Sequence, residues 1–93
     1  MISNNRKLVD ALIKKGVNIP NPSTVEIGEE TDLDLISSQG VIIHAGCKIF
    51  GEKTLIMSGV ELGARSPVTI NNCQLGRNVD LKGGYFEEST FLD

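Results

Sequence analysis

The chain has 93 residues, enough for one small domain, and its net charge of -3 offers no electrostatic reason to bind nucleic acid. Hydrophobic residues make up 40% of the chain, which excludes a disordered polymer, and no apolar run approaches the roughly 18 residues of a membrane span. Val, Ile and Leu number 26, against three Phe, one Tyr and no Trp. We therefore expect a thin core of stacked aliphatic side chains.

Cysteine and histidine usage excludes several classes of site. Cys47 and Cys73 are too few for a disulfide framework, and one histidine without a CxxC pair is no zinc signature. The first residues lack the apolar core of a signal peptide. We therefore expect two buried thiols in a cytoplasmic protein, and neither a metal nor a cofactor.

Residues 1–16 are predicted to form a capping helix, running from about Asn5 to Lys15 and ending at Gly16. Four apolar residues at helical spacing form one stripe along it: Leu8, Val9, Leu12 and Ile13. A helix of three turns is marginal alone in water, so the stripe should dock on the rest of the chain. Residues 17–24, with two prolines, are predicted to be a stiff connector.

A short unit repeats through residues 25–93: a β-branched or small residue, any residue, an aliphatic, and often Gly. The clearest copies are Val25-Glu26-Ile27-Gly28, Val60-Glu61-Leu62-Gly63 and Cys73-Gln74-Leu75-Gly76, and looser copies begin at Thr31, Val41, Cys47, Val68 and Val79. Several aliphatics lie six residues apart, as in Ile43, Ile49 and Leu55, and these are expected to point inward.

Each unit is long enough for a strand of only two or three residues, which cannot stand alone. A hairpin sheet would need longer runs joined by Asn-Gly-type turns, and neither occurs. Flat sides of about six residues with small residues at the corners suit a coil that stacks on itself. We therefore predict an all-β fold, a single-stranded parallel β-helix of about three to four rungs with a short N-terminal α-helix.

The [LIV]-G-x-x-x-x unit resembles the hexapeptide repeat of left-handed parallel β-helix proteins, which include many acyltransferases and the C-terminal half of bacterial N-acetylglucosamine-1-phosphate uridyltransferases. A longer likeness resembles the N-terminal segment of bacterial proteins labelled UDP-N-acetylglucosamine pyrophosphorylase. Its motifs here are GVNIPNPSTVEIG, GVIIHAGCKIFGEKT, PVTINNCQLG and LKGGYFEESTFL. The left hand of the coil follows from this resemblance alone, since general rules for parallel crossovers favour the right hand.

The resemblance implies a transferase, either a nucleotidyltransferase or an acyltransferase, with a sugar nucleotide as ligand. Nucleotidyl transfer needs a Gly-rich phosphate loop, which is absent here, and Gly83-Gly84 is better explained as a turn. We therefore expect a fragment that is truncated at its C-terminal end and inactive alone. The alternative is a non-catalytic module for assembly or positioning.

Four residues are candidates for a site. His44 follows Ile43 in the outward phase, so it is either a general base, as in acyltransferases of this fold, or an ordinary corner residue. Arg65, Arg77 and Lys82 either hold a phosphate or are solvated corner residues near acidic side chains.

We also expect the chain to be a homo-oligomer. Phe91 and Leu92 follow the phase of another coil, and no capping segment comes after them. Relatives with this repeat form trimers with parallel prism axes, so the resemblance implies a homotrimer. An end-stacked dimer is the alternative, because it would cover the open end of the coil.

Overall fold

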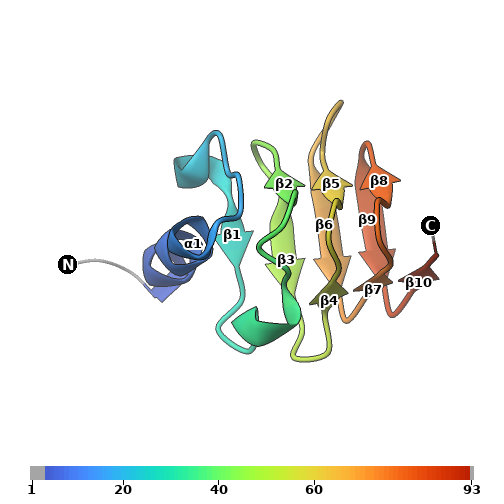
Figure 1. Cartoon of the computed structure of the whole chain (residues 1–93), viewed down its shortest axis with the longest axis horizontal. Helices are drawn as coiled ribbons and strands as arrows, with labels where there is room; N and C mark the ends of the chain where they lie inside the picture. Colours follow the sequence, from blue (N-terminus) through green and yellow to red (C-terminus); the bar gives the residue numbers. More distant parts are fainter. Residues whose placement is uncertain (1–3, 93) are drawn as a thin grey trace.

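The computed structural model describes residues 4–92, which form a β-solenoid of about three turns preceded by one helix. Figure 1 shows the helix at one end of the molecule and the coils following one another along its longest axis. The extents of 38 × 24 × 23 Å fit a short prism. The predicted all-β fold with an N-terminal helix is confirmed.

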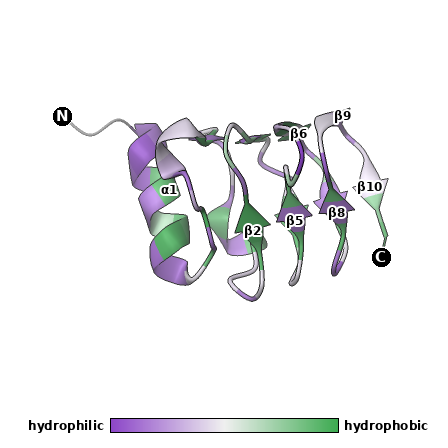
Figure 2. Ribbon diagram, turned by 90° about the horizontal axis from the view of Figure 1, so that it is seen from above, coloured by the Kyte–Doolittle hydropathy of each residue, from purple (hydrophilic) through white to green (hydrophobic). Residues whose placement is uncertain are grey.

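Helix α1 (Asn4–Lys15) docks by its apolar stripe, as expected. Val9 and Leu12 are fully buried, whereas Ile13 is 40% exposed, so its predicted place in the docked stripe is wrong. Figure 2 shows the green, hydrophobic residues of the helix among purple, hydrophilic ones. Within residues 4–92, no helix is both long and apolar enough to cross a membrane.

Three complete coils follow, each made of three short strands. The first contains β2 (Ile42–Ile43), β3 (Lys48–Phe50) and β4 (Leu55–Ile56). The second contains β5 (Glu61–Leu62), β6 (Val68–Asn71) and β7 (Gln74–Leu75), and the third β8 (Asp80–Leu81), β9 (Gly84–Glu87) and β10 (Thr90–Phe91). An incomplete coil precedes them, with β1 (Glu26–Ile27) and single bridges from Asn18 to Ile42 and from Ile36 to Ile56.

Strands of successive coils pair in parallel and build three flat sides: β1-β3-β6-β9, β2-β5-β8 and β4-β7-β10. The registers place inward side chains directly above one another, as predicted for a stacked aliphatic core. One column runs through Ile27, Ile49, Ile70 and Phe86, a second through Ile43, Leu62 and Leu81, and a third through Ile36, Ile56, Leu75 and Phe91. Only the last coil places phenylalanine in these columns.

In each of the three complete coils, the corner after β3, β6 or β9 uses the left-handed backbone region. Gly51 has φ +99, and Asn72 and Glu88 follow at the equivalent corners with φ 53 and 50. A Cβ on Gly51 would lie 2.5 Å from the Asn72 main-chain nitrogen, so glycine is required there. The Asn72 carboxamide accepts a hydrogen bond from the Lys53 amide at 3.1 Å, which ties adjacent coils together at this corner.

The structure corrects one expected inward position and one expected strand. Leu55 lies on the outer face, and its neighbours Thr54 and Ile56 are the buried pair, at 0 and 1% exposure. The step from Ile49 is therefore seven residues, and Thr54 is tolerated inside because its hydroxyl donates to the Phe50 carbonyl at 2.6 Å. The unit beginning at Thr31 is not a strand, because the chain forms a 3₁₀ helix at Leu33–Leu35 instead.

Candidate functional site

A hollow of about 520 Å³ lies at the corner between the sides β2-β5-β8 and β1-β3-β6-β9. Two turns line it, residues 44–46 after β2 and residues 63–67 after β5, together with Thr24. The turn after β5 projects beyond the turns of the neighbouring coils (Figure 1). This longer turn forms one wall of the hollow.

The sequence of the projecting turn explains its shape. Gly63 has φ +83, and a Cβ there would lie 2.6 Å from the Cys47 sulfur, so the chain turns sharply without a side chain. The amides of Arg65 and Ser66 then donate to the Lys82 carbonyl at 3.2 and 2.8 Å. The next coil therefore holds the turn in place, although its side chains are exposed.

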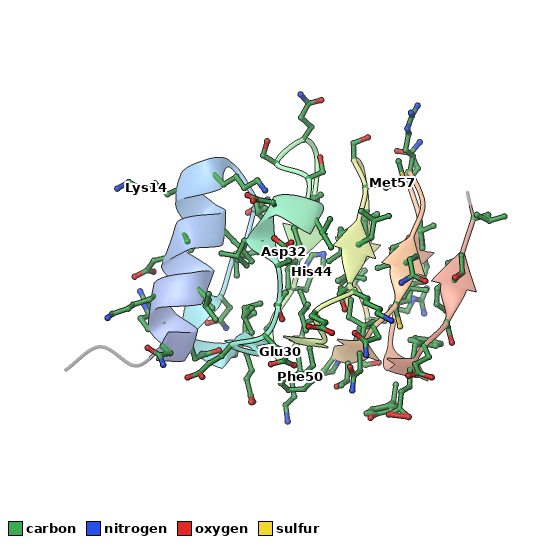
Figure 3. All side chains as sticks on the ribbon, turned by 90° about the horizontal axis from the view of Figure 1, so that it is seen from below. Lys14, Glu30, Asp32, His44, Phe50 and Met57 are labelled. Atoms are coloured by element: carbon green, nitrogen blue, oxygen red, sulfur yellow. The ribbon has the colours of Figure 1, made fainter. Side chains whose placement is uncertain are left out.

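His44 and Glu61 form a hydrogen-bonded pair beside this hollow. The His44 amide donates to the Leu62 carbonyl at 2.9 Å, which fixes the backbone at the end of β2. Its Nε2 lies 2.7 Å from a Glu61 carboxylate oxygen, and the two side chains are 31 and 34% exposed. Figure 3 shows His44 near the middle of the molecule, between the helix and the last strands.

The chemistry of this pair follows from the acceptor character of a carboxylate. An ionised Glu61 can only accept, so Nε2 of His44 carries the hydrogen and Nδ1 keeps a lone pair in the neutral ring. The pair is therefore able to act as an oriented base, which agrees with the predicted outward direction of His44.

The predicted basic residues do not form one cluster. Arg65 lines the hollow with His44, whereas the Lys82 ammonium pairs with Asp80 at 2.5 Å. The main-chain carbonyl of Lys82 accepts the hydrogen bonds that hold the projecting turn. Arg77 lies in the turn between β7 and β8, at a different corner of the prism, and is no part of the lining. Lys82 is therefore engaged by an acidic side chain, and its role in a site stays a prediction.

The two cysteines serve the core. Both are free and fully buried, and the Cys47 sulfur donates to the Leu62 carbonyl at 3.5 Å. Burial raises the pKa of the Cys47 thiol above its ordinary value, so it stays protonated at neutral pH. Among residues 4–92, no three His, Cys, Asp or Glu side chains are grouped so as to hold a metal ion.

Sequence reasoning missed Glu61, Ser66 and Thr24 as parts of this region. Glu61 was visible only as the middle residue of a repeat unit. The signal that could have identified Glu61 was the number of residues in one coil, because this number makes Ile43 and Leu62 stacked partners. That register places Glu61 beside Ile42 in the next coil and brings it within reach of His44.

Comparison of the chain with known protein families, with curated proteins and with solved structures found no match.

Proposed function

We propose that the protein is a β-helical module of the sugar-nucleotide transferase type, either nucleotidyltransferase-like or acyltransferase-like, which binds its ligand in the hollow beside His44. The observation that carries the proposal is that His44, which lines the hollow, is held by Glu61 at 2.7 Å. The repeat motifs and the stacked coils support the same assignment, because they resemble the hexapeptide-repeat family in sequence and agree with it in architecture.

His44 is the group that would accept a proton from a hydroxyl or amine of the ligand. Glu61 holds the ring through Nε2, so Nδ1 is the basic atom. The pair is partly exposed, and a ligand seated in the hollow would shield it from water and strengthen the hydrogen bond. This division of labour makes His44 the binding and proton-accepting residue and Glu61 its positioning residue.

Arg65 is the cation that would contact a phosphate of the ligand. It is exposed on the projecting turn and forms no ion pair with any of residues 4–92, whereas Lys82 is paired with Asp80. An arginine in this position can form two parallel hydrogen bonds to phosphate oxygens. The turn that carries it is anchored through the main chain, which reduces the entropy lost on binding.

Two turns and Thr24 line the hollow, and its outer side is open to solvent, so we infer that catalysis requires a second chain. A homotrimer with parallel prism axes, as the family resemblance implies, would place a neighbouring prism beside a corner of this one. In the isolated chain we expect binding that is weak and turnover that is absent. Weak ligand binding and absent turnover of the isolated chain are therefore two separate expectations.

The test is a titration of ¹⁵N-labelled protein with UDP-N-acetylglucosamine, and separately with acetyl-coenzyme A, followed by amide chemical shifts. We expect shifts at His44, Gly46, Gly63 and Arg65. Arg65→Gln should weaken binding about tenfold, the effect of about 1.4 kcal/mol that one charge-assisted contact supplies. Arg77→Gln is the matched control, because Arg77 is equally exposed in a turn but at another corner.

Two results would overturn the proposal. One is the absence of any localised shift at millimolar concentration of either ligand. The other is equal loss of binding in Arg65→Gln and Arg77→Gln, which would indicate non-specific attraction of an anion to surface charge.

The second candidate function is a non-catalytic module for assembly or positioning. The observation that favours it is the small number of reactive side chains at the hollow, where the described residues provide one acid–base pair and no exposed thiol. In that case His44→Gln and Glu61→Gln would leave every binding property of the chain unchanged, and any partner would contact the sides or ends of the prism.

A further inference from the structure

The hollow beside His44 is lined mainly by residues without a polar side chain. Five of the nine lining residues within 4–92 are of this kind, and we call them the apolar lining: Ala45, Gly46, Gly63, Ala64 and Pro67. They come from two adjacent coils, because the turns that carry them follow the stacked strands β2 and β5. The hollow therefore presents one apolar surface that is built across two coils.

The two coils touch within this lining. A Cβ on Gly46 would lie 2.9 Å from Cγ of Pro67 in the next coil, so the proline ring packs directly on the glycine main chain. Gly46 also has φ +78, which a larger residue rarely adopts. The position of the Pro67 ring in the lining is therefore fixed by the backbone of the neighbouring turn.

The hydroxyl groups around the apolar lining are already engaged. The Thr24 hydroxyl donates to the Asn21 carbonyl at 2.8 Å and accepts from the Gly46 amide at 2.9 Å. The Ser66 hydroxyl is directed to the third coil, with its oxygen 3.5 Å from the Lys82 carbonyl. A ligand in the hollow would have to compete with these contacts for either hydroxyl.

Two polar groups of the lining side chains are left for a ligand. Glu61 holds Nε2 of His44, so Nδ1 is free to accept a hydrogen bond. The Arg65 guanidinium forms no ion pair with any of residues 4–92. The side chains of the site thus provide one acceptor, one cation and an apolar surface next to them.

This apolar surface is not a general feature of the turns of the prism. The turn after β3 carries the exposed Glu52, and the turn after β7 carries the exposed Arg77. The turns after β2 and β5 carry Ala45 and Ala64 in exposed positions instead. Solvated turns favour polar residues, so alanine in both turns of one corner suits a surface that a ligand covers.

We propose that the sugar of the ligand carries a short acyl substituent, and that this substituent occupies the apolar lining beside His44. The inference rests on the function proposed above, in which a hydroxyl or amine of the ligand reaches Nδ1 of His44. Ala45 follows His44 directly in the chain, so the substituent belongs to the same molecule as that hydroxyl or amine. The phosphates of this molecule complement the charge of Arg65.

The preference for an acyl group follows from the cost of burying a hydroxyl. The methyl end of an acyl group covers the alanine and proline surface and displaces water from it. A sugar hydroxyl in the same place would lose water and gain no free side-chain partner there. Ala45 and Ala64 determine this specificity, because a larger side chain at either would fill the space of the substituent.

Titrations of ¹⁵N-labelled protein with UDP-N-acetylglucosamine and with UDP-glucose measure the preference. UDP-glucose carries a hydroxyl where the first ligand carries an acetamido group. We expect UDP-N-acetylglucosamine to bind about tenfold more tightly, the effect of one small apolar group in a pocket. Ala45→Leu should remove most of this difference by weakening the binding of UDP-N-acetylglucosamine. Ala11→Leu is the matched control, because Ala11 is also exposed but lies on helix α1.

Three results would overturn the inference and leave the proposed function standing. Localised shifts with equal affinity for the two sugar nucleotides would show that the lining does not read the substituent. Equal weakening of both ligands by Ala45→Leu would show that leucine blocks the whole sugar. A preference for acetyl-coenzyme A over coenzyme A, without one between the sugar nucleotides, would assign the lining to an acyl donor. No localised shift with any of the four ligands would instead reject the proposed function itself.

Discussion

The two ends of the prism solve the same physical problem in different ways. At the N-terminal end, helix α1 covers the first coil, and the Asn5 carboxamide bonds to the edge of β1 as a neighbouring strand would. In the last coil, the outer edges of β9 and β10 have no strand partner among residues 4–92, and Phe86 and Phe91 are only partly buried. A solenoid coil buries its core only against its neighbours, so each end needs a cover.

The comparison teaches that a helix can terminate a coil when it supplies both apolar surface and polar atoms. Val9 and Leu12 fill the space above the core, at 0% exposure. The Lys15 ammonium donates to the Leu33 carbonyl at 2.6 Å, so the helix is also tied to the 3₁₀ helix of the incomplete coil. In the last coil described, the core columns end in the partly buried rings of Phe86 and Phe91.

A substitution in the middle of the prism serves as the reference for both ends. Ile49→Asp, in the middle, should abolish folding. Ile49 is fully buried, and a lone carboxylate in its place costs several kcal/mol, comparable with the about 5 to 15 kcal/mol of a small domain. Lys48→Asp, one residue earlier and exposed, should change stability by less than about 0.5 kcal/mol. Thermal unfolding followed by circular dichroism compares them, and equal shifts would contradict the inward and outward assignment.

Much of this assignment could be predicted because alternation is a local property. In the units Val25-Glu26-Ile27 and Val60-Glu61-Leu62, the first and third residues are buried whatever the rest of the chain does. The prediction failed at Leu55 because a fixed spacing of six was applied across a corner. The turn at Gly51 adds one residue, so the phase shifts to Ile56.

The site was less predictable than the fold because it depends on distances between coils. His44 was identified as outward, but its partner Glu61 required the register of Ile43 on Leu62. That register depends on the length of all three corners in the coil, and corners of this protein vary in length. Arg65 and Arg77 both follow a Leu-Gly pair in sequence, yet they lie at different corners, because Leu62 ends β5 and Leu75 ends β7 on different sides of the prism.

Truncating one core residue at each end should separate the covered end from the open one. Leu12→Ala removes a fully buried side chain and should cost about 2 to 5 kcal/mol. Phe91→Ala removes a larger side chain that is only partly buried, and should cost about 1 to 2 kcal/mol in the monomer. Urea unfolding of dilute protein measures both. A larger loss for Phe91→Ala would mean that the C-terminal end is closed in solution.

Removing the carboxamide that covers the edge of β1 should have an intermediate effect. Asn5→Ala leaves the Val25 carbonyl and the Ile27 amide without their partner, at a cost of about 1 to 3 kcal/mol. Asn4→Ala is the control, because Asn4 is on the same helix and bonds only to the exposed Glu29 carboxylate. We expect a change below about 0.5 kcal/mol for that variant. Similar losses in the two variants would show that the helix covers the coil by apolar contact alone.

The least invasive comparison uses the two native thiols, which require no substitution. Both are fully buried, but Cys47 lies in the first complete coil and Cys73 donates to the Phe86 carbonyl of the last, at 3.4 Å. A coil with an open edge should open locally at a lower free energy than one covered on both sides. If that difference is about 1.4 kcal/mol, Cys73 should react about tenfold faster with a thiol reagent.

Burial raises the pKa of the Cys47 thiol, and a protonated thiol does not react. The sign of the pH effect follows. The thiolate forms more readily once the chain opens, so raising the pH toward the ordinary thiol pKa destabilises the folded state and speeds labelling of Cys47. Labelling of dilute protein at several pH values, with peptide mapping by mass spectrometry, separates the two sites. Faster labelling of Cys47 at every pH would place the less stable end of the prism at the helix, and would contradict this comparison of the two ends.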